Sequence, residues 1–476
     1  MREDTLIGSR ITTYTVILAV PLTIIVAFIL LKTNYIYALT AALGLGVLIL
    51  TFINTDFAIY ILIFSMLLSP EFGSRTTGGE GVTIRIDDIL MAIIIFTWLA
   101  KTALYKDLGL FKSTPLNKPI RIYVFVCVIS TAFGMLFGRV RFTSGTFFVL
   151  KYIQFFMIYF MVVNHVKTKK QIENFLIAHI ISYAIVTFVA VAQIPQGHRL
   201  TAPFEGEGGE PNTLGGYLIL TIALNLGLIL TPGILTKAKY RRALIMLTGI
   251  SVFPFLLTNS RGSWVASIPV IIAYIFYSQR RYIIIGFIMF MAMFAPIILP
   301  EAVITRVKYT FTEEKNPYAR GLQEQVGGIT LDTSSSERVR SWKLAFQELP
   351  QHPFLGFGVT GWRFLDAQYM RVLIETGVIG LFSFLYLLYV LQKKVFSIYK
   401  TSVIPLFKAY ALGFYIANYA MYVHGIGANT FIIIRIMEPY WLLAGLAMCI
   451  PEIEKIELDK LSEMEKEALR VKAGTI

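Results

Sequence analysis

Arginines are the most prominent candidates for chemistry in this chain, because they recur in polar connections between long apolar segments. The planar guanidinium binds two oxygens of a phosphate at once, so such arginines suit a phosphate-bearing substrate. They are Arg75, Arg85, Arg139, Arg141, Arg199 and Arg261, followed by Arg306, Arg320, Arg338, Arg340 and Arg363 in one longer polar segment. Two interpretations are open: a site for a lipid-linked phosphate, or ordinary loop arginines on a solvated face.

The longer polar segment, about 301–365, contains the pattern of one amphipathic helix. Ser334 and Glu337 have the spacing of a capping box that begins a helix, and a later proline would end it. Apolar residues follow at helical spacing: Val339, Trp342, Phe346 and Leu349. We expect the two aromatic residues among them to pack on the apolar domain or at its interface. Arg338 lies in the first turns, where a helix N-terminus favours an anion.

The next helix carries acidic residues that could take part in acid–base chemistry. Asp366 lies at its start, where an aspartate is typically an N-cap. Arg371 and Glu375 are four residues apart within an apolar stretch, so they can pair on one helix face. Such a buried pair can be functional or can hold the helices together. Asp366 and Glu375 are about 180° apart around a helix, so they cannot form a carboxylate pair within it.

The remaining reactive side chains indicate no cofactor and no metal. Either His352 or His424 could supply an imidazole, and a hydrogen-bonding role is the simpler alternative for each. Cys127 and Cys449 lie within apolar spans, and no group of His, Cys or Asp has metal-ligand spacing. The stretch 356–361 matches the pattern G-x-G-x-x-G but lacks the βαβ context of a dinucleotide site, so its glycines predict tight turns.

Composition places these residues on a membrane protein. Of the 476 residues, 56% are hydrophobic and only 15% are charged, whereas about 25% are charged in a soluble domain. Apolar stretches of about 20 residues recur, which is the length of a membrane-spanning helix and too long for a membrane β-strand. The net charge of +14 is explained by basic cytoplasmic loops, so we expect no nucleic-acid partner. The predicted fold is all-α, with about 12–14 transmembrane helices.

The predicted spans are read from hydropathy along the chain. They are 11–31, 34–53, 55–69, 86–104, 119–138, 146–165, 171–193, 213–232, 241–258, 262–279, 282–299, 366–391, 402–423 and 430–450. Four regions follow: N-terminal transmembrane helices at 1–300, a large extracytoplasmic loop at 301–365, C-terminal transmembrane helices at 366–450 and a cytoplasmic tail at 451–476.

Orientation follows from basic clusters on alternate connections, because cytoplasmic loops collect Lys and Arg. The clusters are Lys106, Lys112, Lys118 and Arg121; Lys167, Lys169 and Lys170; Lys237, Lys239, Arg241 and Arg242; Arg280 and Arg281; and Lys393, Lys394 and Lys400. All of them are cytoplasmic if both termini are cytoplasmic. The arginines of the first paragraph and the large loop then share the outer face.

Short motifs on that face resemble the O-antigen ligase and polymerase superfamily of bacterial membrane glycan transferases. They are Thr258-Asn259-Ser260-Arg261-Gly262-Ser263-Trp264, Arg338-x-x-x-Trp342, His352-Pro353 to Gly358, Tyr369 through Glu375-Thr376-Gly377-Val378-Ile379-Gly380, and the stretch from Arg199 to Asn212. The similar region runs from about residue 199 to residue 380. Each motif is weak alone, and their order and common face make the resemblance specific.

The resemblance implies a GT-C-like helical bundle in the bacterial plasma (inner) membrane that acts as a metal-independent glycosyltransferase in surface polysaccharide biosynthesis. Such proteins move a glycan from undecaprenyl pyrophosphate onto a saccharide or lipid-linked acceptor at the outer face. By this resemblance Arg261 and Arg338 would hold the pyrophosphate. Residues that could support them are Arg199, His352, Gln368, Tyr369, Glu375 and His424.

One departure concerns the catalytic base. The ligase pattern has a histidine where this chain has Asp366. An aspartate can also act as a base but is weaker at its usual pKa, so Asp366 is our candidate catalytic residue and favours a polymerase or exopolysaccharide-type transferase over a strict lipopolysaccharide ligase. The alternative from another class is a transporter or flippase for lipid-linked saccharides, which typically shows internal repeats and midplane polar groups.

Overall fold

The computed structural model describes most of the chain as helix. The described residues are 35–72, 84–105, 112–205, 209–233, 238–298, 300–309, 323–326 and 329–473. The predicted span 11–31, Arg75 and Arg320 lie outside them. The chain divides into two compact units, and each is treated by itself below.

The first unit comprises Met1–Leu62 and Asp88–Leu108. Its described part contains α2 (Tyr35–Ile53), the first half of α3 (Thr55–Leu68) and most of α4 (Ile86–Tyr105). The α2 and α3 sequences are nearly continuous apolar runs. Lys101 Nζ of α4 donates to Thr55 Oγ1 at 3.4 Å, so a hydrogen bond links α4 to the first residue of α3.

The second unit, Ile63–Asp87 and Gly109–Ile476, holds the rest of the described structure. Its long helices are α5 (Asn117–Leu136), α6 (Phe142–His165), α7 (Lys169–Gln193), α8 (Pro211–Leu230), α9 (Ala238–Leu257), α10 (Arg261–Tyr277), α11 (Arg281–Ile298), α15 (Gln368–Thr401), α16 (Pro405–Gly427) and α17 (Ile434–Ala473). Its shorter elements are α12 (Glu301–Tyr309), α14 (Thr333–Glu348), η1 (Ile194–Gln196), η2 (Leu349–Gln351) and η3 (Thr430–Ile432). Two antiparallel pairs of two-residue strands join β1 (Glu71–Phe72) to β2 (Ile84–Arg85) and β3 (Gln325–Val326) to β4 (Ile329–Thr330).

The helices confirm the predicted fold class. From 34–53 onward, the first residue of each predicted span lies within about one helical turn of the first residue of a described helix. Seven helices among the described residues are long and apolar enough to cross a membrane, and others are shorter. The chain is therefore a polytopic helical membrane protein. One detail differs from the prediction, because α17 continues the last span without a break through residue 473.

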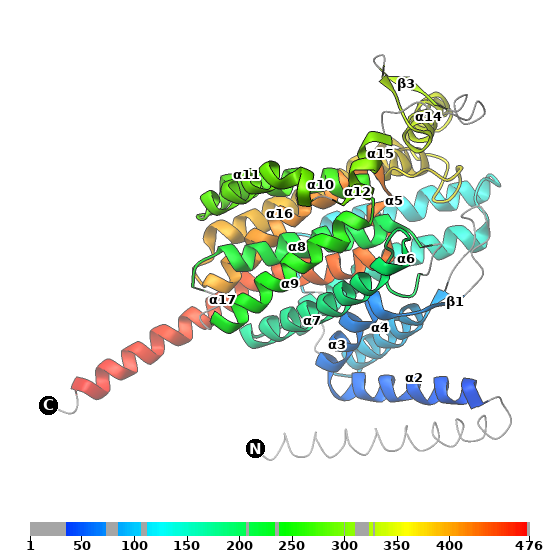
Figure 1. Cartoon of the computed structure of the whole chain (residues 1–476). Helices are drawn as coiled ribbons and strands as arrows, with labels where there is room; N and C mark the ends of the chain where they lie inside the picture. Colours follow the sequence, from blue (N-terminus) through cyan, green and yellow to red (C-terminus); the bar gives the residue numbers. More distant parts are fainter. Residues whose placement is uncertain are drawn as a thin grey trace. The chain divides into compact units, whose positions relative to one another are not determined.

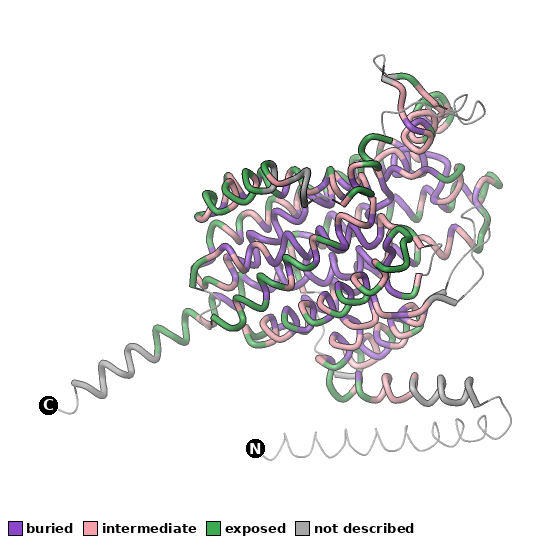
Figure 2. Tube along the Cα trace, in the orientation of Figure 1, coloured by how far each residue is buried: buried purple, intermediate pink, exposed green. Residues whose placement is uncertain are grey.

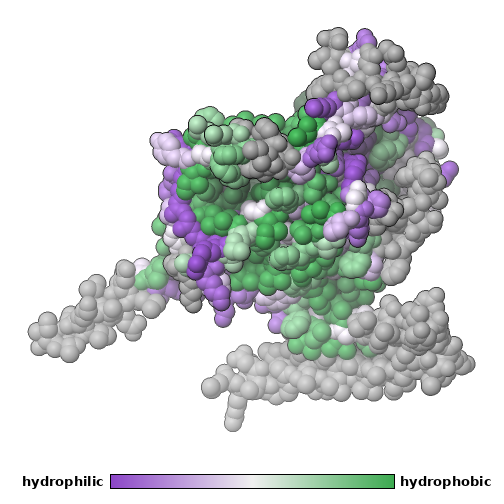
Figure 3. Space-filling view, in the orientation of Figure 1, coloured by the Kyte–Doolittle hydropathy of each residue, from purple (hydrophilic) through white to green (hydrophobic). Residues whose placement is uncertain are grey.

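The core of the second unit is centred on α8. This helix packs against α16, α9 and α10, while α15 packs against α16 and α5 (Figure 1). The backbones of α8 and α16 approach closely, since a Cβ added to Gly227 would lie 2.6 Å from Gly413 Cα. Buried residues follow these inner helices in Figure 2, and Figure 3 shows hydrophobic side chains over the middle of the helical face and hydrophilic ones toward its ends.

A buried arginine fixes the chain that precedes α8. Arg435 of α17 is 1% exposed, and its Nη1 donates to the carbonyls of Pro203 at 2.7 Å and Leu67 at 2.8 Å. Its Nε lies 3.4 Å from the carboxylate of Glu205. A buried charge is tolerated when it is paired and hydrogen-bonded in this way. Arg435 therefore holds the loop that carries Arg199.

The glycine-rich stretch 356–361 packs against α15 where that helix is interrupted. Gly377 has φ 70° and ψ −172°, which interrupts the helix. The backbone amides of Phe357 and Gly358 donate to the carbonyls of Ile374 at 3.0 Å and Glu375 at 2.8 Å. Gly356 has φ 66°, and a Cβ there would lie 2.5 Å from the Glu375 carbonyl carbon. The tight turns predicted for these glycines are thus confirmed, and their role is to satisfy the broken helix.

Candidate active site

The first part of the site is the turn between α9 and α10. Asn259 takes the left-handed conformation with φ 52°, which asparagine tolerates better than most residues. Ser260 is the N-cap of α10, and its hydroxyl accepts from the amide of Ser263 at 3.3 Å. Arg261 is the first residue of α10, and its Nη2 lies 2.8 Å from Asp332 Oδ2.

Asp332 brings the large loop to this turn because it caps α14. Its side chain accepts from the amide of Ser335 at 3.1 Å. Burial disfavours the charged carboxyl, but hydrogen bonds from Arg261 and Ser335 and the charge of Arg261 outweigh it and hold the pKa of Asp332 below its ordinary value. The predicted capping box at Ser334 and Glu337 is wrong, since α14 begins at Thr333. The run Asp-Thr-Ser-Ser-Ser offers several residues that can cap a helix, and the aspartate does so.

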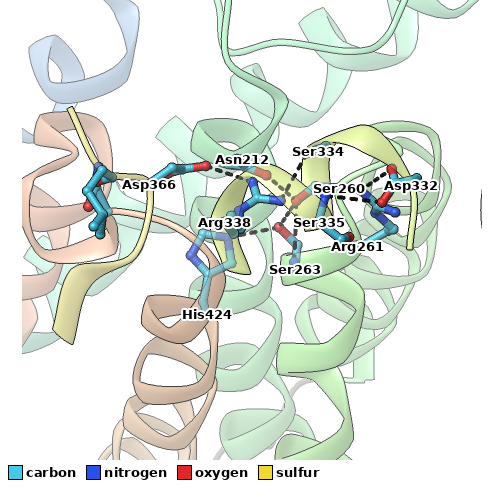
Figure 4. A network of polar contacts seen from close by, with 12 residues as sticks. Asn212, Ser260, Arg261, Ser263, Asp332, Ser334, Ser335, Arg338, Asp366 and His424 are labelled. Atoms are coloured by element: carbon cyan, nitrogen blue, oxygen red, sulfur yellow. Dashed lines mark hydrogen bonds and ion pairs between the residues drawn. The ribbon is translucent and has the colours of Figure 1, made fainter. Parts of the chain in front are cut away.

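Arg338 connects α14 to the residue predicted as the base. Its Nη1 donates to Ser334 Oγ at 3.1 Å and its Nη2 to Asp366 Oδ2 at 2.7 Å (Figure 4). The two side chains are 26% and 30% exposed. Asp366 is not an N-cap, because Ala367 holds that position with extended backbone and α15 begins at Gln368. Its carboxylate is therefore available to Arg338.

Two further arginines lie beside this group. Arg199 donates from Nε to the carbonyl of Thr258 at 3.3 Å and from Nη2 to that of Asn259 at 3.0 Å. Burial lowers the pKa of Arg199, and the charges of Arg306 and Arg261 lower it further. The pKa of Arg306 is also lowered, by burial and by the charges of Arg261 and Arg338, although the nearby carboxylate of Asp332 raises it. We call Arg199, Arg261, Arg306 and Arg338 the arginine cluster.

Sequence reasoning missed Arg306 as a member of the site. It was only one of the arginines of the long polar segment, and the α12 sequence Glu301–Tyr309 has no motif that distinguishes it. The arginine cluster carries four positive charges against the two carboxylates of Asp332 and Asp366, so these six residues have a net charge of +2. Each carboxylate is already paired with an arginine. The group therefore favours an anion over a metal cation.

A chain of neutral polar groups lies behind Arg261. Ser260 Oγ donates to Asn212 Oδ1 at 2.7 Å and lies 2.8 Å from Ser263 Oγ. Ser263 Oγ in turn lies 3.1 Å from Nε2 of His424, whose side chain is fully buried. Nδ1 of His424 lies 2.8 Å from Thr430 Oγ1 (Figure 4 shows His424 below Ser263). His424 thus links the start of α10 to the end of α16 and has the hydrogen-bonding role left open above.

The other predicted supporting residues do not join the cluster. Glu375 pairs with Arg371 at 3.0 Å, as its spacing predicted, and accepts from the amide of Thr360 at 3.1 Å. Gln368 at the start of α15 accepts a hydrogen bond from the backbone amide of Phe431 in η3. Tyr369 donates from its hydroxyl to the carbonyl of Tyr422 in α16.

His352 and Trp342 pack against other aromatic or apolar residues, whereas Phe346 is exposed. His352 packs edge-on against Phe357, and burial and the charge of Arg139 lower its pKa. Trp342 packs against a buried cluster that includes Phe357 and Ile374. Phe346 is 58% exposed. Of the two aromatic residues expected to pack, Trp342 alone packs within the described part of the chain.

Residues 244–385, which is 142 of the 476, match the family model described as O-antigen ligase. This segment of the chain is therefore similar to the O-antigen ligase family. Its resemblance to the O-antigen ligase and polymerase superfamily is confirmed, and the matched segment contains Arg261, Arg306, Arg338 and Asp366. Arg199 and His424 lie outside it. No curated protein matches the chain.

Proposed function

We propose that the chain transfers a glycan from an undecaprenyl-pyrophosphate donor to a saccharide or lipid-linked acceptor at the outer face of the bacterial plasma membrane. The observation that carries this proposal is the arginine cluster, in which arginines from four separate segments lie close enough to influence one another's charge and two of them pair with Asp332 and Asp366. The O-antigen ligase match, which includes Arg261, Arg306, Arg338 and Asp366, supports a glycan-transferring reaction.

The proposed chemistry assigns each charged group a role. The acceptor hydroxyl oxygen forms a bond to the anomeric carbon of the donor sugar as the bond from that carbon to the diphosphate oxygen breaks. Asp366 takes the hydroxyl proton, and the diphosphate leaves with the bonding electrons. Arg261 and Arg338 stabilise the negative charge that develops on the diphosphate. Arg199 and Arg306 raise the local positive potential.

Arg338 couples the two halves of this reaction. In the structure it holds Asp366 at 2.7 Å, and it would also contact the diphosphate. Its guanidinium has five donors, so it can keep Asp366 in place while it binds a phosphate oxygen. Because the arginines neutralise the leaving group, the proposed reaction needs no divalent ion.

The proposed topology puts both termini in the cytoplasm and the 301–365 loop outside. The regions at 1–300, 301–365, 366–450 and 451–476 are then N-terminal spans, outer loop, C-terminal spans and cytoplasmic tail. The basic clusters on alternate connections support this orientation, and the site residues all belong to connections or helix ends on the proposed outer side.

The test is an in vitro assay with purified protein and the undecaprenyl-pyrophosphate-linked repeat unit of the same cell. Lengthening lipid-linked products without added acceptor would identify a polymerase, as Asp366 in place of the ligase histidine favours. A single shift of added lipid A-core would identify a ligase. A chelator should leave either activity unchanged, and loss that a divalent ion reverses would contradict metal independence.

The same preparation separates the transferase from the alternative transporter or flippase. If folded protein forms no product with its own substrate but moves that lipid across vesicle membranes, the transferase proposal fails.

A further inference from the structure

A cavity lies next to the proposed base and shares only Arg338 of the arginine cluster with the proposed diphosphate site. It has a volume of about 220 Å³ and lies between the first turns of α14 and the segment before α15. Its lining includes Ser334, Glu337, Ser341, Trp342, Phe364 and Asp366. We call it the α14 pocket. Arg338 also lines it, whereas Arg199, Arg261 and Arg306 do not.

The spacing of the α14 residues explains why they share this wall. Glu337 and Arg338 lie three and four residues after Ser334, and Ser341 lies four and three residues after them, so these residues form one stripe along the helix. The N-cap at Asp332 sets the phase of that stripe. Asp332 also pairs with Arg261 at 2.8 Å, so α14 adjoins the diphosphate site at its N-terminus and the pocket along this stripe.

The chemistry of the lining is that of a sugar site. Glu337 and Asp366 accept hydrogen bonds from hydroxyls, and Ser334 and Ser341 both donate and accept them. Trp342 and Phe364 offer apolar rings against which the C–H groups of a pyranose can pack. Trp342 is held in place by its packing against the buried cluster that includes Phe357 and Ile374, so its position in the pocket wall is fixed before a ligand binds.

The same lining disfavours the other substrates of the reaction. Glu337 and Asp366 outweigh the charge of Arg338, so the lining has a net charge of −1 (two carboxylates against one guanidinium) and disfavours a diphosphate. A polyprenyl chain would leave the carboxylates and hydroxyls without partners. A neutral polyhydroxyl ring satisfies both the polar and the aromatic parts of the pocket.

We propose that the α14 pocket binds one sugar ring of the acceptor glycan and directs a hydroxyl of that ring toward Asp366. This inference rests on the proposed glycan transfer, because it names the acceptor side of that reaction. It assigns Glu337, Ser341 and Trp342 to acceptor recognition and separates them from the arginines that hold the donor.

The first test is steady-state kinetics of Glu337→Gln and Ser341→Ala. The acceptor is the oligosaccharide of the repeat unit, free of lipid and phosphate, so that it cannot serve as donor. Each variant should raise the KM for this acceptor about tenfold, which corresponds to about 1.4 kcal/mol, with the KM for the lipid-linked donor unchanged. Phe346→Ala is the matched control, because Phe346 is an exposed residue of the same helix outside the pocket. Unchanged acceptor KM values, or an equal rise in the KM for donor, would overturn the inference.

The second test does not depend on turnover. The oligosaccharide released from the repeat unit, free of lipid and phosphate, is titrated against the purified protein by calorimetry. Wild type and Arg261→Ala should bind it equally, while Glu337→Gln and Trp342→Phe should bind it at least tenfold more weakly. If the wild type transfers no glycan but this pattern holds, the proposed reaction fails and the sugar site stands. If the wild type does not bind the oligosaccharide, or if the pocket variants bind it as well as the wild type does, the sugar site is wrong.

Discussion

Two ion pairs near the start of α15 each join an arginine to a carboxylate, but their surroundings differ. Arg371 and Glu375 are 9% and 6% exposed, with their atoms 3.0 Å apart, and Glu375 accepts a further backbone amide. Arg338 and Asp366 are 26% and 30% exposed and adjoin a cavity. The side chains of the buried pair are largely shielded from solvent. The half-exposed pair joins a net positive cluster that a substrate can reach, so accessibility separates the structural pair from the candidate site.

The largest expected effect is on the cluster that contains the half-exposed pair. Arg261→Ala and Arg338→Ala should each lower kcat for glycan transfer by about 100- to 1000-fold, the usual effect of removing one group that stabilises a leaving or developing anion. Arg340→Ala is the matched control on α14, because Arg340 pairs with Glu324 at 3.7 Å, away from the cluster. Transfer at the wild-type rate by either cluster variant, with normal expression and membrane insertion, would contradict the assignment.

Asp366→Asn should have a comparable effect by a different route. The amide cannot take a proton, so kcat should fall by about 100-fold or more. Donor affinity should stay the same or increase, since Arg338 loses its anionic partner and remains available to the diphosphate. A variant that keeps its kcat, or that loses donor affinity in parallel with activity, would show that Asp366 is not the base.

A change in the buried pair should lower the stability of the protein and leave substrate binding unchanged. Glu375→Gln leaves the buried guanidinium of Arg371 without its counter-charge, so we expect a loss of about 3–5 kcal/mol of folding free energy. The remaining folded protein should keep its KM for donor and acceptor. Thermal denaturation of the detergent-solubilised protein measures the first quantity. An unaltered melting temperature with altered kinetics would reverse the roles of the two pairs.

The sequence was sufficient for the features that depend on local pattern. The apolar spans and the Arg371–Glu375 pair follow from hydropathy and from a spacing of four residues, which are local properties. The capping-box pattern predicts the cap of α14 at Ser334, whereas Asp332 caps the helix, because several adjacent residues can cap. Position alone favours Asp366 as an N-cap, since the extended conformation of Ala367 leaves no mark in the sequence.

The site itself depends on contacts between segments that are distant along the chain. The motifs identified Arg261 and Arg338 separately, and only the fold shows that Asp332 joins their helices. Arg306 carries no local signal at all. The hydrogen-bond partners of His424 are also not predictable from the sequence, because its two ring nitrogens contact Ser263 of α10 and Thr430 of η3. Pairing and burial of this kind are tertiary properties that one sequence does not encode in a readable local pattern.

The smallest effect concerns the link between the loop and α10. Asn is as good an N-cap as Asp, so Asp332→Asn should keep α14 and lose only the ion pair with Arg261, at a cost of about 1 kcal/mol or less. The folded-state pKa of Asp332 is below its ordinary value of 3.8. Its contribution is therefore fully present above that value and is lost as the pH falls through the lower folded-state pKa. The melting temperatures of wild type and variant should converge as the pH is lowered from 5 to below 3.8. A constant difference over that range would mean that the pair does not contribute.

Direct binding of the donor lipid tests the central claim that the arginine cluster holds the diphosphate. Undecaprenyl pyrophosphate, which is the donor without its transferable glycan and so cannot turn over, is titrated against wild type, Arg261→Ala, Arg338→Ala and the control Arg340→Ala. We predict that the two cluster variants bind this lipid at least tenfold more weakly, a loss of about 1.4 kcal/mol or more for each. Arg340→Ala should bind it as the wild type does. Wild-type affinity in both cluster variants would contradict the account.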